Sequence, residues 1–261
     1  MSQNQKQIQK YVKLIYQPQG SKKELDAIVF YKGAGYSTIH NLLRNEPETI
    51  YPWHITDLLS DKQESLDYLL RKYYDNLLKH VYALDRVFRK NRVLEKKQVV
   101  YRGIKRDNYQ LGQMETLEKS GSILEKSYMS TSFNPMYSFI WASPTHDVKH
   151  MIMLEFELPV GTPYLIVGWD VFNPTKEAIK HSEMELLLPR GCILHLIEKK
   201  EKNYSFQITF ENILKHKKYK ILTYKCRIEY TGEPDVPSAN EYMETMRFEA
   251  TSDFSKIYLS P

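Results

Sequence analysis

The sequence predicts an α+β protein, because helical and strand-like patterns occupy different parts of the chain. Apolar residues recur at helix spacing through the first third. From about Gln98 onward, short runs rich in β-branched and aromatic residues alternate with turn signals. The last of these runs, Thr223–Tyr230, alternates apolar and polar residues, as a half-buried strand does. Separate helical and strand-forming regions are typical of the α+β class.

Four helices are expected in the N-terminal part. The first carries apolar residues at helix spacing over 8–15, and the second begins at Ser21, which forms a capping box with Glu24. A third is expected over Ser37–Arg44, and the longest over Ser60–Lys90. The apolar stripe of the longest helix, which we interpret as core, comprises Leu66, Leu69, Leu70, Tyr73, Leu77, Val81, Leu84 and Phe88.

The rest of the chain is expected to consist mainly of short strands. Two further helices are expected near Met114–Lys119 and, opened by Pro135, over Met136–Ala142. The expected strands are 99–104, 127–133, 151–158, 164–167, the stretch that begins at 183, 192–197, 206–210 and 223–230.

Length and composition indicate one globular domain. With 261 residues and 42% hydrophobic content the chain can bury a large core. We divide it into a helical subregion at 1–95, a β-rich core at 96–230 that forms one domain with the helices, and a C-terminal tail at 231–261. No apolar run approaches the ~18 residues of a membrane span. The N-terminus lacks the apolar core of a signal peptide, and two cysteines make no disulfide framework, which favours a reducing compartment.

Several classes of function are disfavoured. The formal charge of +5 is spread over interleaved signs rather than a basic stripe, so nucleic acid is not the expected ligand. The Gly33-Ala34-Gly35 run lacks the third glycine of a dinucleotide fingerprint and ends a helix rather than a strand. His146 and His150 lie four apart with no cysteine nearby, so no metal site is expected.

Three features in the strand-rich part point to chemistry. Arg102 lies inside an apolar strand, where a guanidinium needs an anion and fits a pyrophosphate well. A serine in the run Ser130-Thr131-Ser132 can hold a buried carboxylate by a hydrogen bond. The stretch EMELLLPRG carries two glutamates at i and i+2, which in a strand project from one face, while Met184 and Leu186 project into apolar packing.

Together these parts would bind a dinucleotide and break a glycosidic bond. One carboxylate would stabilise an oxocarbenium-like sugar while the other acted as a base. Each part alone has an ordinary structural explanation. The arginine fits a buried ion pair, the hydroxyls fit a Ser/Thr-rich strand, and the glutamates fit a solvated strand edge.

With these motifs in order, the chain resembles the arginine-specific mono-ADP-ribosyltransferases, in particular the exoenzyme-toxin type of catalytic domain. The resemblance spans about Ile28–Lys199 and rests on YRG, MSTS, LEFELPVGTPYLIV and SEMELLLPRG. The N-terminal Tyr31 also matches, whereas His40 stands where the family commonly has Asn. The resemblance implies N-terminal helices packed on two short, roughly perpendicular, mainly antiparallel sheets around an NAD cleft.

The resemblance also implies roles for the motif residues. Arg102 would hold the NAD phosphates, and Gly103 would meet the nicotinamide amide through its backbone. Ser130 would position the catalytic Glu185, which bonds the ribose 2′-hydroxyl, and Glu183 would activate the acceptor guanidinium.

The remaining implied roles concern the nicotinamide pocket and the target. Thr131 and Ser132 would shape the pocket, and an aromatic after the triplet, Phe139 or next Trp141, would stack on the nicotinamide. In the loop before the glutamates, aromatic side chains would pack against the target protein; these are Trp169 and Phe172.

The expected function is cleavage of NAD and transfer of ADP-ribose to an arginine of a target protein, by a monomer that uses no metal. Two alternatives stay open: an NAD glycohydrolase on the same scaffold, and an inactive basic module that binds protein or nucleic acid. A cytoplasmic protein and an effector delivered into a host cell both fit the sequence. The sequence identifies neither the acceptor protein nor the delivery route.

Overall fold

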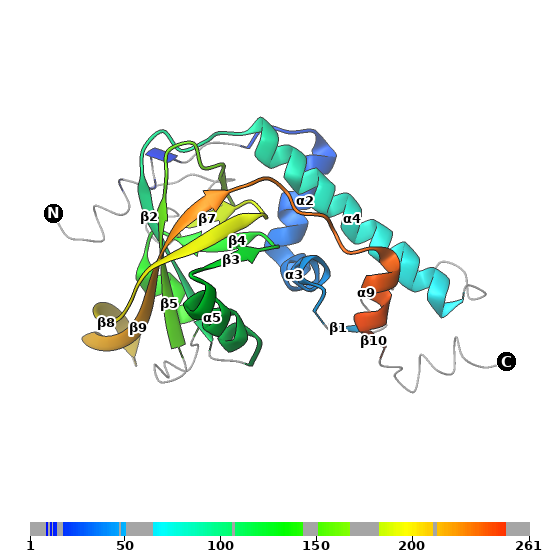
Figure 1. The fold of residues 1–261 in the computed structure, drawn as a ribbon. Coiled ribbons are helices and arrows are strands. Elements are labelled where there is room, and N and C mark those ends of the chain that lie inside the picture. Colours follow the sequence, from blue (N-terminus) through cyan, green and yellow to red (C-terminus); the bar gives the residue numbers. More distant parts are fainter. Residues whose placement is uncertain are drawn as a thin grey trace. The chain divides into compact units, whose positions relative to one another are not determined.

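The computed structural model describes residues 9, 11, 13–14, 18–46, 48–50, 65–105, 108–142, 151–167, 183–210 and 213–248. The chain forms two compact units. Unit 1 consists of Met1–Gln19 and Phe88–Glu233, and unit 2 consists of Gly20–Val87 and Pro234–Pro261. Figure 1 labels the elements of both units.

The helical segments are α2 (Lys22–Phe30), the π-helical η1 (Tyr31–Gly35), α3 (Tyr36–Arg44), α4 (Leu66–Lys90), α5 (Asn108–Ser120), α6 (Pro135–Ala142) and α9 (Ala239–Thr245). The strands are β1 (Glu48–Ile50), β2 (Gln98–Lys105), β3 (Ser122–Glu125), β4 (Met129–Ser132), β5 (Met151–Leu158), β6 (Leu165–Ile166), β7 (Glu185–Leu188), β8 (Cys192–Phe210), β9 (Ile213–Tyr230) and β10 (Met246–Phe248). The mixed helix and sheet content confirms the α+β class.

Unit 1 contains an eight-stranded sheet with the order β3-β8-β9-β5-β2-β4-β7-β6. Its strands pair antiparallel except for β5 with β9. The family resemblance implied two separate sheets, whereas the hydrogen bonds join all eight strands into one. The strands β3-β8-β9-β5-β2 and β4-β7-β6 are connected by few hydrogen bonds, because β2 and β4 share the single register pair Tyr101↔Ser132.

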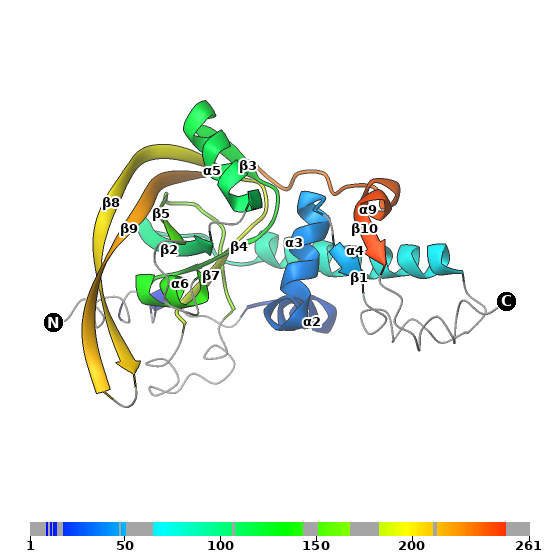
Figure 2. The same ribbon diagram turned by 90° about the horizontal axis from the view of Figure 1, so that it is seen from below.

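The strands β8 and β9 are much longer than the sequence pattern suggests. The expected short strands 192–197 and 206–210 belong to one strand, β8, of 19 residues. Charged residues between these runs look like a loop in the sequence. In the structure these residues have partners from other elements: Glu198 lies opposite Lys225 across the ladder, and Lys199 and Lys202 form ion pairs with Glu118 and Glu155. Figure 2 shows the two strands as a long curved pair.

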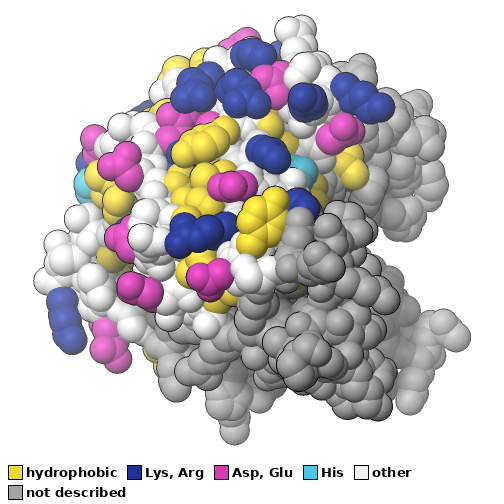
Figure 3. Space-filling view, turned by 90° about the vertical axis from the view of Figure 1, so that its right-hand side faces the viewer, with side chains coloured by type: hydrophobic (Ala, Val, Ile, Leu, Met, Phe, Trp, Pro, Cys, Tyr) yellow, Lys and Arg dark blue, Asp and Glu magenta, His cyan; other side chains and the backbone are white. Residues whose placement is uncertain are grey.

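The described surface mixes both signs of charge. On the face drawn in Figure 3, Lys and Arg side chains are interspersed with Asp and Glu around hydrophobic ones. No helix in the described part of the chain is both long and apolar enough to cross a membrane.

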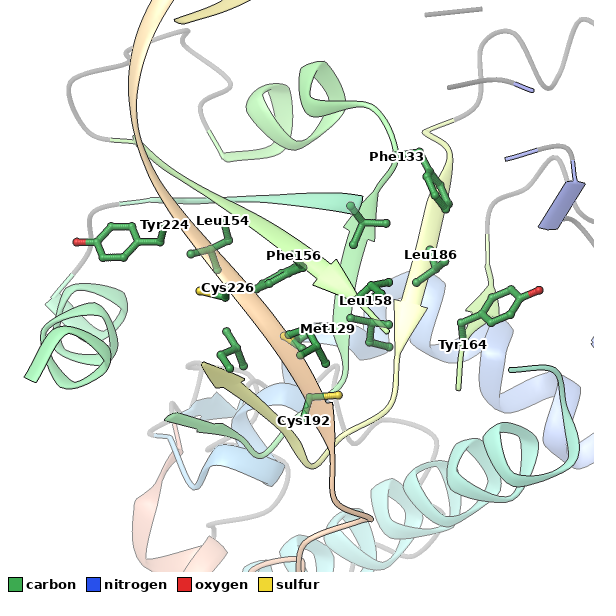
Figure 4. Close-up of a cluster of buried hydrophobic side chains, with 14 of the residues drawn as sticks. Met129, Phe133, Leu154, Phe156, Leu158, Tyr164, Leu186, Cys192, Tyr224 and Cys226 are labelled. Carbon is green, nitrogen blue, oxygen red and sulfur yellow. The ribbon is translucent and has the colours of Figure 1, made fainter. Parts of the chain in front are cut away.

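The main core of unit 1 lies against the middle of the sheet. It contains side chains that are almost fully buried, among them Met129, Phe156, Leu186 and Cys226 (Figure 4). Both cysteines are free and buried, and burial raises the pKa of the Cys226 thiol to about 12. A neutral buried thiol packs as a small hydrophobic side chain.

Unit 2 is built on the stripe of α4, which is buried as expected. The buried residues include Leu69, Leu77, Val81 and Leu84. The capping box at Ser21 is also present at the start of α2. A π-helical turn separates α2 from α3, and within it Gly33 leaves helical geometry at ψ −124°.

The C-terminal segment folds back as ordered structure in unit 2, through Phe248. Its strand β10 pairs parallel with β1, and Ser238 caps α9. Tyr242 is fully buried, with its ring centroid 5.6 Å from that of Tyr74. The Tyr74 hydroxyl donates to the carbonyl of Pro237 at 2.6 Å. The region expected to be a tail therefore contributes a large side chain to a core.

We predict that Tyr242→Ala lowers the free energy of unfolding by about 3 kcal/mol, because it removes a buried aromatic ring. Glu244→Ala, at an exposed position of the same helix, should change it by less than about 0.5 kcal/mol. Urea denaturation followed by circular dichroism measures both. Equal effects of the two substitutions would show that α9 contributes nothing to the core.

Candidate active site

Three neighbouring strands bring the sequence motifs together. In the sheet β4 lies between β2 and β7, so the hydroxyl triplet is flanked by the arginine strand and the glutamate strand. Ser132 pairs with Glu185 and Ser130 with Leu187 across β4 and β7. Residues opposite one another share a face, so Ser130, Ser132 and Glu185 lie on the same face of these strands.

Ser130 contacts both the arginine and the second glutamate. Its hydroxyl donates to Oε1 of Glu185 at 2.6 Å, and its carbonyl oxygen accepts from Nη1 of Arg102 at 3.3 Å. Glu185 is only 6% exposed. A buried carboxylate is stable only when hydrogen bonds replace its hydration, and the Ser130 hydroxyl supplies one. The Arg102 guanidinium and the buried Glu185 carboxylate therefore both form hydrogen bonds with Ser130.

The other two hydroxyls of the triplet fix the backbone around Glu185. Thr131 donates to the carbonyl of Leu186 at 2.6 Å, and Ser132 donates to that of Glu183, also at 2.6 Å. The Ser132 oxygen also accepts from the backbone N–H of Asn134 at 2.9 Å. These bonds hold the chain on both sides of the buried carboxylate.

Met184, between the two glutamates, adopts an unusual backbone conformation. Its φ of +49° lies in the left-handed region, which is costly for a residue with a side chain. Strand β7 begins only at Glu185, so the strand alternation expected to set the two carboxylates side by side does not extend to Glu183. The expected burial of the Met184 side chain is confirmed, since it is 1% exposed and belongs to the main core.

Glu183 is half-buried and lies in electrostatic reach of α6. Burial, and secondly the Glu183 carboxylate, raise the pKa of the Tyr137 phenol. Asn134 and Pro135 open α6, with the Asn134 side chain accepting from the N–H of Met136 at 3.0 Å. Tyr137 was not singled out in the sequence, although its place shortly after the triplet is a signal that could have found it.

Of the aromatic residues expected to contact the nicotinamide or the target, one is buried and the others lie outside the described part of the chain. Phe139 is fully buried, and its ring centroid lies 4.8 Å from that of Tyr219. It is therefore a core residue, with no exposed face for a nicotinamide to stack on. The side chain of Trp141 and the whole of Trp169 and Phe172 lie outside the described residues.

The remaining site residue, Gly103, lies in β2 opposite Met153 of β5. Within the described part of the chain, no group of three or more His, Cys, Asp or Glu side chains is arranged to hold a metal ion.

Comparison with protein-family models assigns the chain to a family. The family model described as ADP-ribosyltransferase exoenzyme matches residues 2–225. A comparison with curated protein sequences finds no match.

Solved structures share the fold at low sequence identity. The C3 exoenzyme of Clostridium limosum has a TM-score of 0.51 and 14% identity, over 88% of this chain and 96% of that one. The ADP-ribosyltransferase Vis of Vibrio splendidus, solved with the inhibitor M6, has a TM-score of 0.50 and 14% identity, over 88% of this chain and 86% of that one.

We predict that Glu183→Gln lowers the pKa of Tyr137 towards its usual value, because the substitution removes a negative charge that disfavours the phenolate. The pKa should stay above the usual value, since burial is the larger cause. An NMR titration with 13C-labelled tyrosine rings measures it, with Tyr137→Phe for assignment. Tyr164, whose raised pKa has other causes, should titrate unchanged. An unaltered Tyr137 would place the Glu183 carboxylate away from α6.

Proposed function

The chain belongs to the ADP-ribosyltransferase exoenzyme family, and we propose that it cleaves NAD and transfers ADP-ribose to an arginine of a target protein. The observation that carries this proposal is the linkage of Arg102 and Glu185 through Ser130, at 3.3 and 2.6 Å. Such a linkage puts an anion-binding group and a cation-stabilising group at neighbouring positions, as a site for a pyrophosphate joined to a reactive ribose requires.

Arg102 would bind the pyrophosphate. A guanidinium presents several N–H donors in one plane and pairs with phosphate oxygens through two hydrogen bonds at once. The bond from Nη1 to the Ser130 carbonyl limits the directions in which the side chain can point. An arginine oriented before the ligand arrives loses less entropy on binding.

Glu185 would stabilise the sugar during cleavage. As the bond between the ribose C1′ and the nicotinamide nitrogen breaks, its electron pair leaves with nicotinamide and positive charge develops on the ribose. A fixed carboxylate offsets this charge, and it costs no reorganisation because Ser130 already holds it. The carboxylate would also accept a hydrogen bond from the ribose 2′-hydroxyl.

Glu183 would act on the acceptor. An arginine side chain is a poor nucleophile while protonated, since its pKa exceeds ~12. A carboxylate that takes a proton from the guanidinium allows its nitrogen to attack C1′ of the ribose. The turn at Met184 takes Glu183 out of strand β7, so the two carboxylates stand in different backbone settings and can serve two partners.

The family of this chain also bears on where it acts. Because the matching family is described as an exoenzyme, we infer that this chain is an effector delivered to a host cell and that the acceptor is a host protein.

We predict that Glu185→Gln lowers NAD cleavage at least about 100-fold, because it removes the charge that stabilises the cationic ribose. Glu183→Gln should leave NAD cleavage within a few-fold of wild type and abolish transfer to arginine. Release of nicotinamide measures cleavage, and labelling of agmatine or of lysate proteins from radiolabelled NAD measures transfer.

The outcomes of this pair separate the possible activities. Normal transfer by Glu183→Gln would contradict the role given to that residue. Free ADP-ribose as the only product of the wild type would identify a glycohydrolase. Unchanged NAD would identify a binding module without catalytic activity.

We further predict that Arg102→Lys raises KM for NAD about tenfold with a smaller change in kcat, because lysine lacks the paired donors. Ser130→Ala should instead lower kcat, since Glu185 loses its fixed partner, and Ser130→Thr should restore part of the rate. Arg92→Lys, at an exposed position, serves as the control. Steady-state kinetics of nicotinamide release distinguish these effects. If Arg102→Lys and Ser130→Ala changed kcat and KM by the same factors, the two residues would not have separate roles.

A further inference from the structure

The link between β4 and α6 runs beside the segment that carries Glu183. The Ser132 hydroxyl donates to the carbonyl of Glu183 at 2.6 Å, and the backbone N–H of Phe133 donates to the carbonyl of Met184 at 3.2 Å. The Ser132 oxygen also accepts from the backbone N–H of Asn134 at 2.9 Å. Glu183 is therefore held next to the residues at which α6 begins.

The first turn of α6 fixes the backbone position of Tyr137. The Asn134 side chain accepts from the N–H of Met136 at 3.0 Å, and the Asn134 carbonyl accepts from the N–H of Tyr137 at 3.1 Å. A proline at the first helical position restricts this turn further. Because Asn134 and Glu183 are bonded to the same serine, a short series of hydrogen bonds connects the backbone of Tyr137 to that of Glu183.

Tyr137 projects from the side of α6 that is opposite its buried side. Pro135, Ser138 and Phe139 are buried, and at about 100° per residue they share one side of the helix. The other side carries Tyr137 and Ile140, and Ile140 is 37% exposed. Tyr137 is half-buried, so it keeps some surface that another molecule can contact.

The chemistry of Tyr137 and Glu183 suits a planar cation. The Tyr137 phenol stays neutral at physiological pH, because burial and secondly the Glu183 carboxylate raise its pKa. The faces of a neutral aromatic ring carry partial negative charge and attract cations. A guanidinium stacks on such a face and also pairs with a carboxylate through the N–H groups at its edge. The ring and the half-buried carboxylate can therefore bind one guanidinium together.

We propose that the Tyr137 ring stacks on the guanidinium of the acceptor arginine and holds it against Glu183. Stacking occupies the face of the guanidinium and leaves its edge for the carboxylate that takes the proton. A lysine ammonium is more compact and more strongly hydrated, so it gains less from the ring. Tyr137 thus helps to select arginine as the acceptor.

This role rests on the proposed function, because it requires transfer to arginine with Glu183 acting on the acceptor. It adds a residue from α6 to the strand residues already assigned. The alternative is that Tyr137 only packs α6 against its surroundings, in which case its substitution would not act on the acceptor in particular.

Kinetics of ADP-ribose transfer from NAD to agmatine, a small guanidinium compound, test the proposal with the full chain. Tyr137→Leu removes the ring and should raise KM for agmatine about tenfold. Tyr137→Phe keeps the ring and should leave KM for agmatine within about twofold of wild type. KM for NAD should change by less than about twofold in both variants, since the ring acts on the acceptor.

The matched control truncates an exposed side chain of the same helix. Ile140→Ala should leave KM for agmatine within about twofold of wild type. Thermal unfolding followed by circular dichroism reports that each variant folds, and Tyr137→Phe, which removes only a hydroxyl, tests the ring even if the leucine variant does not fold.

The results separate this proposal from the proposed function. An unchanged KM for agmatine in Tyr137→Leu, a tenfold rise in Tyr137→Phe, or an equal rise of KM for NAD and for agmatine would overturn the role of Tyr137 alone. A wild type that releases nicotinamide but transfers no ADP-ribose to agmatine would overturn the proposed function together with it.

Discussion

The hydrogen bond from the Ser130 hydroxyl to the Glu185 carboxylate is the interaction on which the rest of the site depends. It keeps a charged group stable at a position that is 6% exposed. It also requires β4 to lie directly beside β7, which fixes the order of the central strands. The carbonyl of the same serine accepts from Arg102, so the position of the guanidinium follows from the same strand order.

The backbone near this bond is costly and is held in place by its surroundings. Met184 adopts a left-handed conformation that disfavours side chains, while its own side chain is buried in the core. Ser132 bonds to the carbonyl of Glu183, and the N–H of Phe133 donates to the carbonyl of Met184 at 3.2 Å. These bonds and the apolar packing offset the strain. Strain of this kind is frequent where a protein must present two groups in a fixed relation.

Local patterns in the sequence predicted the parts of the site that depend on strand alternation. The burial of Leu186 and Met184 follows from residue type and spacing. The pairing of Ser130 with Glu185 came from the family resemblance, because these residues lie 55 positions apart in the chain. The left-handed turn at Met184 could not be predicted, because methionine has no preference for that conformation. The burial of Phe139 could not be predicted either, since its covering ring, Tyr219, comes from a strand 80 residues later in the chain.

The fold shows the same division between local and distant determinants. The helices α3 and α6 and the strand β5 lie where the sequence pattern predicted them, and α4 ends at Lys90 as predicted. The predicted start of that helix at Ser60 lies outside the described residues. The length of β8 was missed, because a run of Lys and Glu resembles a loop until its partner strand is known. The order within α9 and β10 was missed for a related reason. The partners of this turn-rich segment, Tyr74 and β1, are distant in the sequence, so the pairing is visible only in the folded structure.

A crystal structure of the protein with bound NAD tests the central claim most directly. The account predicts that pyrophosphate oxygens lie within hydrogen-bonding distance of the Arg102 guanidinium, while the nicotinamide ribose lies against the Glu185 carboxylate with Ser130 still bonded to it. NAD bound with neither side chain in contact, or with the Ser130 hydroxyl turned away from Glu185, would contradict it.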